Sequence, residues 1–251
     1  MNTYKIYFSP TNHTKKIVDI IGDEFDVSEE IDISNPKISL KKVFSPEDIC
    51  IVGVPSYGGR VPAVALERMA EYQGNGAKAV LVVSYGNRAY EDTLRELQDN
   101  LMKRGFQCIA GIAAIAEHSI MHQFATGRPD EKDKKELQSF ARKIQEKLQE
   151  DTYEVLQLSK DTPYREYHGV PLKPKAKKNC KGCGVCASLC PVGAISSKNP
   201  KETNRDMCIS CMRCVEICPS HARKVSGLKL KIASRKLQKV CSEGKENELF
   251  L

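Results

Sequence analysis

Eight of the eleven cysteines occur in two copies of one pattern, C-x2-C-x2-C-x3-C-P, which begin at Cys180 and Cys208. Three thiolates on one tight loop can hold three irons of a cubane. In the two-cluster form of this pattern, the fourth cysteine binds an iron of the other cluster. The sequence therefore predicts two 4Fe-4S clusters. The ligands of the first are Cys180, Cys183, Cys186 and Cys218, and those of the second are Cys208, Cys211, Cys214 and Cys190.

Zinc and disulfide bonds are the alternatives for these thiols. A four-cysteine zinc site needs only two C-x2-C pairs, so it leaves the middle cysteine and the Cys-Pro ending unexplained. Disulfides are disfavoured in a reducing compartment. The first ten residues contain Lys5 and no apolar run of the kind found in a signal peptide, so we expect a cytoplasmic protein. No apolar stretch is long enough to span a membrane.

The positive charge is concentrated in the C-terminal part of the chain. Residues 1–150 hold 20 Lys and Arg against 22 Asp and Glu, whereas residues 151–251 hold 19 against 10. Such an excess can indicate nucleic-acid binding. Each cluster with its four thiolates, however, carries a charge of roughly −2, which the basic residues would compensate. We therefore expect no nucleic-acid partner.

The first 150 residues alternate short apolar runs with longer amphipathic segments, which is typical of a parallel sheet covered by helices. The predicted strands are 4–9, 29–34, 48–56, 78–86 and 107–116, and the predicted helices are 13–25, 61–73, 90–104 and a segment that starts at Asp130. Cys50 and Cys108 fall in strands and are expected to be buried apolar residues. The fold class is thus a doubly wound α/β domain with a five-stranded parallel sheet.

In such sheets, ligands bind beyond the carboxyl ends of the strands. The turn after the first strand, "FSPTNHTKK", is rich in hydroxyl and amide groups at the start of a helix, which suits a phosphate as well as ordinary helix capping. The expected phosphate-binding residues are Ser9, Thr11, Asn12, His13 and Thr14. The G-x-G-x-x-G and G-x-x-x-x-G-K-[ST] motifs are both absent, which argues against a dinucleotide or ATP site.

Two further turns place aromatic residues beside glycine, where a flat ligand can approach the backbone closely. A phosphate site together with two such turns favours a phosphorylated planar cofactor. The residues predicted to contact it are Pro55, Ser56, Tyr57, Gly58 and Gly59 in one turn, and Ser84, Tyr85, Gly86, Asn87, Arg88 and Tyr90 in the other.

With these three turns, the domain resembles the flavodoxins, because "SPTNHT" is similar to their [ST]-x-T-x-x-T phosphate loop. The resemblance implies FMN, with Tyr57 and either Tyr85 or Tyr90 flanking its ring system. Arg60 and Arg88 depart from the acidic ring environment of flavodoxins. Because a nearby cation favours the anionic reduced flavin, we expect a higher two-electron potential than in a typical flavodoxin.

The segment 116–133 is too long for an ordinary strand-to-helix connection. It contains His118 and His122, which are weak candidates for proton donors. The fragments "YGNRAYED" and "EHS...GRPDEKD" resemble proteins in which a flavodoxin-like domain is fused to a ferredoxin-like one. The expected organisation is a flavodoxin-like domain at 1–150, a linker at 151–175, a small α+β two-cluster ferredoxin-like domain at 176–225 and a basic, helical tail at 226–251.

These predictions describe an electron-transfer protein that couples the one-electron chemistry of two 4Fe-4S clusters to the one- or two-electron chemistry of FMN. Its partner would be a redox protein or a small-molecule acceptor. One alternative is an FMN-dependent reductase of a small substrate, fed by its ferredoxin domain. Another is a cysteine-rich interaction module without flavin. The sequence shows no strong acid-base constellation, so electron transfer is favoured over a substrate-specific enzyme.

Overall fold

A six-stranded sheet forms the centre of the larger domain in the computed structural model, which describes all of residues 1–251 except 40, 151, 153, 159 and 161. The strand order is β10-β7-β6-β4-β1-β2. The strands are β1 (Thr3–Tyr7), β2 (Val27–Asp32), β4 (Ile49–Pro55), β6 (Lys78–Tyr85), β7 (Gln107–Ile115) and β10 (Glu248–Phe250). The five strands predicted from the sequence are parallel, and their order is the flavodoxin-like one of doubly wound sheets.

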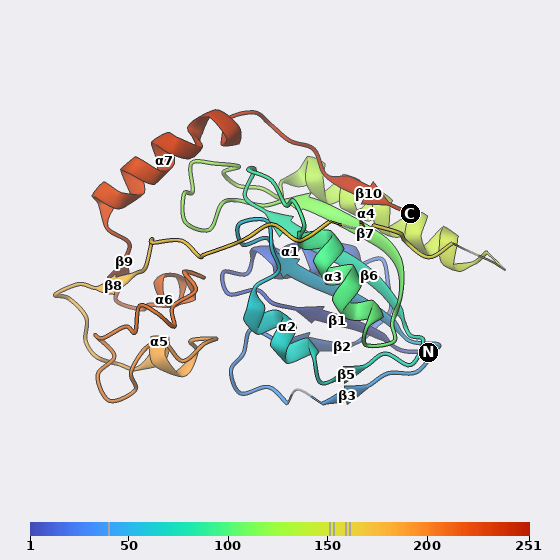
Figure 1. Cartoon of the computed structure of the whole chain (residues 1–251), viewed down its shortest axis with the longest axis horizontal. Coiled ribbons are helices and arrows are strands. Elements are labelled where there is room, and N and C mark those ends of the chain that lie inside the picture. The colour runs from blue at the N-terminus through green and yellow to red at the C-terminus, as the bar shows by residue number, and fades with distance from the viewer. Residues whose placement is uncertain (40, 151, 153, 159, 161) are drawn as a thin grey trace.

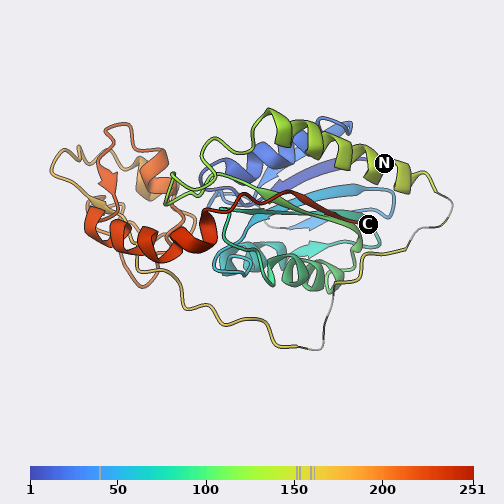
Figure 2. The same cartoon turned by 90° about the horizontal axis from the view of Figure 1, so that it is seen from above.

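Four helices cover the two faces of this sheet (Figure 2). Helices α1 (His13–Gly22) and α4 (Glu131–Leu148) bury their apolar stripes on one face, and α2 (Ala63–Met69) and α3 (Thr93–Met102) lie on the other. The central strand β4, "ICIVGVP", is apolar and almost wholly buried because it has helices on both sides. The predicted α/β class is confirmed.

The helices are shorter than the ranges predicted from the sequence. The second begins only after Pro62 and ends at Met69, because Tyr72 turns into the core against Phe44, with the ring centroids 5.7 Å apart. Tyr72 and Gln73 form β5, which pairs with β3 (Lys42–Val43) in a separate two-stranded sheet. Burial of Tyr72 therefore overrides the helical pattern at this end.

The smaller module is built from two short helices, α5 (Val185–Ser188) and α6 (Arg213–Glu216), and from β8 (Lys175–Ala176) paired with β9 (Arg223–Lys224). Each helix follows a residue with left-handed backbone, Gly184 in one half and Met212 in the other. The two cysteine motifs thus share one local fold. In Figure 1 this module lies at one end of the molecule, beyond the strands of the larger domain.

The connection between the two parts is docked on the larger domain. The Leu156 N–H donates to the carbonyl of Cys108 at 2.8 Å, and the Leu156 side chain is buried. Further on, the Tyr164 ring lies under the guanidinium groups of both Arg60 and Arg95, at 4.8 and 4.3 Å from its centroid. Tyr153 and Ser159 of this connection lie outside the described residues.

The basic tail forms helix α7 (Gly227–Cys241) and then returns to the larger domain as β10. Strand β10 pairs antiparallel with β7 and adds the sixth strand, which the sequence did not predict. Buried Asn247 fixes this return: its Oδ1 accepts from the Ile115 N–H at 2.9 Å, and its Nδ2 donates to Asp133 at 2.9 Å and Glu136 at 2.6 Å. Among the described residues, no helix is both long and apolar enough to cross a membrane.

The substitution Asn247→Ala should lower the free energy of unfolding by about 1.5–3 kcal/mol, because it removes buried hydrogen bonds to two carboxylates. Denaturant unfolding of the loaded protein measures the effect. Asn199→Ala is the matched control, since exposed Asn199 bonds only to exposed Glu202 and its own turn, and its effect should stay within about 0.5 kcal/mol. Equal effects of the two substitutions would contradict the role given to Asn247.

Candidate functional site

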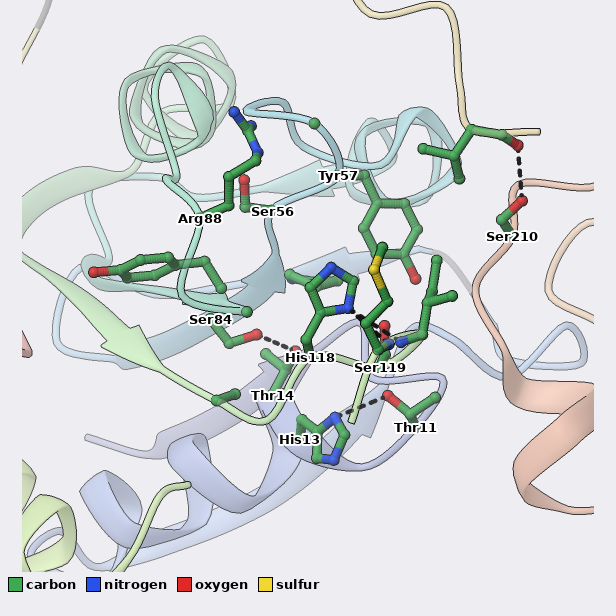
Figure 3. A pocket seen from close by; sticks show the side chains of 18 of the residues that line it. Thr11, His13, Thr14, Ser56, Tyr57, Ser84, Arg88, His118, Ser119 and Ser210 are labelled. Carbon is green, nitrogen blue, oxygen red and sulfur yellow. Dashed lines mark hydrogen bonds between the residues drawn. The ribbon is translucent and has the colours of Figure 1, made fainter. Parts of the chain in front are cut away.

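A cavity of about 410 Å³ lies beyond the carboxyl ends of β1, β4, β6 and β7. Its volume is within the range of small-molecule and cofactor sites. All three turns singled out in the sequence contribute to its wall. The predicted residues that line it are Thr11, His13, Thr14, Pro55, Ser56, Tyr57, Gly58, Ser84, Tyr85, Gly86, Arg88 and His118. Figure 3 shows how their side chains converge from separate loops.

The first turn has the properties of a phosphate site. Asn12 is in the left-handed region at the N-cap of α1, which an asparagine tolerates well. The Ser9 hydroxyl accepts from the Lys15 N–H at 2.9 Å, so Ser9 caps the helix. Within the described part of the chain, the N–H groups of Thr11, His13 and Thr14 have no hydrogen-bond acceptor. Such free donors at a helix N-terminus are what a phosphate requires.

The two tyrosines at the cavity have different environments. Tyr85 is buried, whereas Tyr57 belongs to the turn that approaches the smaller module. Burial raises the pKa of the Tyr57 phenol well above its ordinary value, and negative charge at Cys211 acts in the same direction. Tyr57 therefore stays neutral and lies close to a cluster-binding loop. Both residues can pack against a planar ring system.

Several predicted residues lie around the cavity without lining it. Tyr90 packs on Tyr85, with ring centroids 5.2 Å apart, and its hydroxyl donates to Glu248. Asn87 donates to the carbonyls of Cys241 and Glu243, so it holds the end of α7. The full group outside the lining is Ser9, Asn12, Gly59, Asn87, Tyr90 and His122. Of the two candidate tyrosine partners for Tyr57, the geometry thus favours Tyr85.

His118 and His122 differ in their relation to the cavity. His118 lines it, and its Nδ1 accepts from the N–H groups of Ile120 and Met121 at 3.2 and 3.3 Å. Burial lowers the pKa of His118 to about 4. At neutral pH it is therefore an uncharged imidazole with its proton on Nε2, a hydrogen-bond donor and a poor acid. His122 is exposed and pairs with Glu117 at 2.6 Å.

Residues far away in the sequence complete the cavity. The linker contributes Arg165, Tyr167, Val170 and Leu172, the smaller module contributes Ile209 and Ser210, and α7 contributes Leu237. The Tyr167 ring leaves no room for a side chain at Gly58, since a Cβ there would lie 2.3 Å from it. The Ser210 hydroxyl donates to the Val170 carbonyl, as Figure 3 shows at the edge of the cavity. No local motif marks these residues as parts of a cofactor site.

The eight motif cysteines gather around two small cavities in the smaller module. One, the first cluster site, is lined by Cys180, Cys183, Cys186 and Cys218. The other, the second cluster site, is lined by Cys190, Cys208, Cys211 and Cys214. In each, three cysteines come from one motif and the fourth from the other, which is the exchange that the spacing predicts.

The surroundings of these sites fit anionic clusters. The N–H groups of Ala194 and Ala222 donate to the sulfurs of Cys190 and Cys218 at 3.3 and 3.2 Å, in equivalent positions of the two motifs. Although burial acts to raise it, hydrogen bonds from backbone N–H groups keep the pKa of Cys218 below its ordinary value. Arg223 is 1% exposed, and its Nε has no partner among the described residues. Cluster sulfur beside the first cluster site would supply an acceptor.

The thiols surround these cavities rather than a single point. Among the residues that the structure describes, no three His, Cys, Asp or Glu side chains converge closely enough to hold one metal ion. Each cavity gathers four thiols, three from one motif and one from the other, as a two-cluster ferredoxin requires.

Two buried arginines join the module to the larger domain. Arg213, between Cys211 and Cys214, donates to the carbonyls of Ser9 and Pro10 at 3.3 Å and to the Ser34 hydroxyl at 2.7 Å. Arg68 of α2 donates to the Pro191 carbonyl at 2.7 Å. Both arginines are buried, with 9% of each residue exposed. The loop that offers free N–H groups to the cavity is thus held on its carbonyl side by the second cluster site.

Comparisons with known proteins agree with this division. Residues 179–223 match the model of the 4Fe-4S dicluster domain family. Over 46 residues the chain is 46% identical to the polyferredoxin protein MvhB of Methanothermus fervidus. This match covers 18% of the chain and 11% of that protein, so the chain spans only a small part of this relative.

The larger domain resembles solved flavodoxin structures. An archaeal flavodoxin gives a TM-score of 0.41 at 15% identity, covering 60% of this chain and all of that one. Flavodoxin 1 from Bacillus cereus gives 0.44 at 18% identity, covering 58% and 98%. The apo form of an NADH:FMN oxidoreductase (EMOB) gives 0.42 at 13% identity, covering 57% and 87%.

The strand order, the cavity and the dicluster match together define the class of protein. The chain joins a domain with the flavodoxin-like strand order to a module that matches the 4Fe-4S dicluster domain family. The predicted fold is confirmed, and the dicluster match supports two 4Fe-4S clusters in the smaller module.

If the first turn binds the FMN phosphate, Thr11→Val should weaken FMN binding about tenfold or more, because a hydrogen bond to a charged group contributes about 1.5–3 kcal/mol. Fluorescence titration of apoprotein with FMN measures the dissociation constant. Thr152→Val, at an exposed residue outside the cavity, is the control and should bind like the wild type. Unchanged affinity in the Thr11 variant would show that the Thr11 hydroxyl does not bind the phosphate.

Of the two arginines suggested by the sequence, only Arg88 lines the cavity; Arg60 pairs with buried Glu96 and donates to the Arg165 carbonyl.

Arg88→Ala should lower the two-electron flavin potential by on the order of tens of millivolts, since a partly screened positive charge is lost. Its pairing with Glu91 limits the effect. Anaerobic redox titration measures the flavin potential, and Arg142→Ala, at an exposed position of α4, is the control. An unchanged potential in the Arg88 variant would overturn the idea.

Proposed function

We propose that this protein carries electrons between two 4Fe-4S clusters in its C-terminal module and an FMN held at the strand ends of its N-terminal domain. The observation that carries the proposal is a shared wall: Ile209, between the cluster ligands Cys208 and Cys211, lines both the larger cavity and the second cluster site. A flavin in that cavity and a cluster held by those cysteines would be neighbours. Such an arrangement supports transfer within one chain.

The residues that would hold the flavin are divided among the three turns. Free N–H groups around Thr11 and His13 suit the phosphate, and Tyr57 and Tyr85 suit the ring system. When bound, FMN supplies one- and two-electron chemistry and each cluster supplies one-electron chemistry. Neutral His118 can donate a hydrogen bond into the cavity from Nε2. The linker, the cluster loop and α7 exclude bulk water from one side of the site.

We place this protein in the cytoplasm, where thiols stay reduced, and we expect its partners to be redox proteins. Tyr167, Ser210 and Leu237 of the chain itself line the cavity, which leaves less of it for another protein to contact. This arrangement supports delivery of electrons to the flavin through the clusters.

The proposal is tested by an anaerobic reductive titration of purified protein, with the visible spectrum and the iron, sulfide and FMN contents measured on the same sample. Separate bleaching of the flavin and of the cluster absorption is expected, with eight irons and one FMN per chain. Cluster absorption without FMN would refute the flavin assignment. A colourless protein after reconstitution would refute the proposal as a whole.

Arg213→Met should slow internal electron transfer, measured on protein whose FMN and iron contents have been brought to those of the wild type. The substitution removes hydrogen bonds from a buried guanidinium, each worth about 1.5–3 kcal/mol, and so loosens the cluster loop from the flavin domain. Flash photoreduction of the flavin, followed by the rate at which the clusters become reduced, measures the effect. Arg205→Met, at an exposed arginine of the same module, is the control. Equal rates in both variants would contradict the docking role of Arg213.

A further inference from the structure

The two cluster sites stand in different relations to the flavin cavity. The second cluster site shares Ile209 with that cavity, and negative charge at Cys211 and Cys208 acts on the Tyr57 phenol. Among the described residues, those that line the first cluster site do not also line the flavin cavity. The second cluster site is therefore the internal one.

The same two sites also differ in their exposure to solvent. Cys183 of the first cluster site is exposed, and Cys180 and Cys218 are half-buried. In the second cluster site, Cys190 and Cys211 are buried. A Cβ added at Gly182 or Gly184, on either side of Cys183, would meet nothing within 4 Å. The backbone around Cys183 thus borders open space, and another protein can come close to this site.

Lysines surround this exposed cysteine loop. They are Lys175, Lys177, Lys178, Lys181 and Lys224, here called the lysine surface, and all are exposed. Lys175 faces Lys224 across the β8–β9 pair, and Lys181 also lines the first cluster site. The structure's described ion pairs include none of them. Between residues 173 and 224 there are eleven Lys and Arg against three Asp and Glu, more positive charge than two clusters of roughly −2 compensate.

We propose that the lysine surface is the docking site for a small acidic ferredoxin, and that electrons enter or leave the chain at the first cluster site. The proposal rests on the proposed function. In each encounter the reduced ferredoxin would lose one electron, and a cluster held at the first cluster site would gain that electron without proton transfer. The second cluster site lies between the first cluster site and the flavin cavity in this path. Complementary charge speeds such encounters about 10- to 1000-fold at low ionic strength.

The test mixes fully loaded, oxidised protein with a one-electron-reduced acidic ferredoxin in a stopped-flow instrument, at low and at moderate salt. The charge-reversal variant is Lys177→Glu, Lys178→Glu and Lys181→Glu. The matched control is Lys231→Glu, Lys236→Glu and Lys239→Glu, which makes the same change of charge at exposed positions of α7. Cluster and flavin absorption of each variant verifies that it is folded and loaded.

The wild-type second-order rate constant should fall steeply as salt is added. The variant at the lysine surface should react at least about tenfold more slowly at low salt and should lose this dependence, while the α7 variant stays within about threefold of the wild type. Equal slowing by both variants, or no salt dependence in the wild type, would overturn the docking site. A wild-type protein that holds neither flavin nor clusters would contradict both the proposed function and this inference. The absorption spectrum distinguishes that result from failure of the docking site alone.

Discussion

The buried guanidinium of Arg213 connects the cluster-binding module to the phosphate loop of the larger domain. Arg213 lies between two ligands of the second cluster site and donates to the carbonyls of Ser9 and Pro10. Because those carbonyls face the module, the N–H groups that follow them in the turn remain available to the flavin cavity. The cation also favours negative charge on both of its sides, the phosphate and the cluster. A single side chain thereby orients the phosphate loop and positions the cluster loop.

The rest of the interface follows from the need to satisfy groups buried around this contact. Arg68 donates to the Pro191 carbonyl, and Lys173 donates to the Cys208 carbonyl. The linker then crosses the cavity with Tyr167 against Gly58. Polar groups of both domains are paired across the interface. Separation of the two domains would return these groups to water and would expose Ile209 and the other apolar residues between the two cavities. The docked arrangement is therefore a defined state rather than one of many tethered positions.

Local patterns in the sequence were sufficient for the parts whose chemistry is contained in a short segment. The two cysteine motifs, each of the five parallel strands and the turn at 9–14 carry a signal within about 15 residues. Arg213 carries none, because its acceptors lie about 200 residues away and "CMRC" gives no hint of them. Strand β10 was not predicted for the same reason. It has only three residues, which show no strand pattern of their own, and the hydrogen bond from the Ile115 N–H to Asn247 holds them beside β7. Tyr90 was predicted as a possible partner of the flavin ring, but its hydroxyl donates to Glu248 on β10, a strand that the sequence did not predict.

Apart from the exposed Arg205, the basic residues of the module divide by side-chain type. Arg213 and Arg223 are buried, where the planar guanidinium can satisfy several carbonyl and hydroxyl acceptors at once. The lysines, apart from Lys173, are exposed, where a compact ammonium keeps its hydration. The positive excess seen in the sequence thus has two physical uses. The buried arginine charge offsets the clusters and ties the module to the flavin domain, while lysine charge remains on the outer surface, beside the cluster site that contains the exposed Cys183.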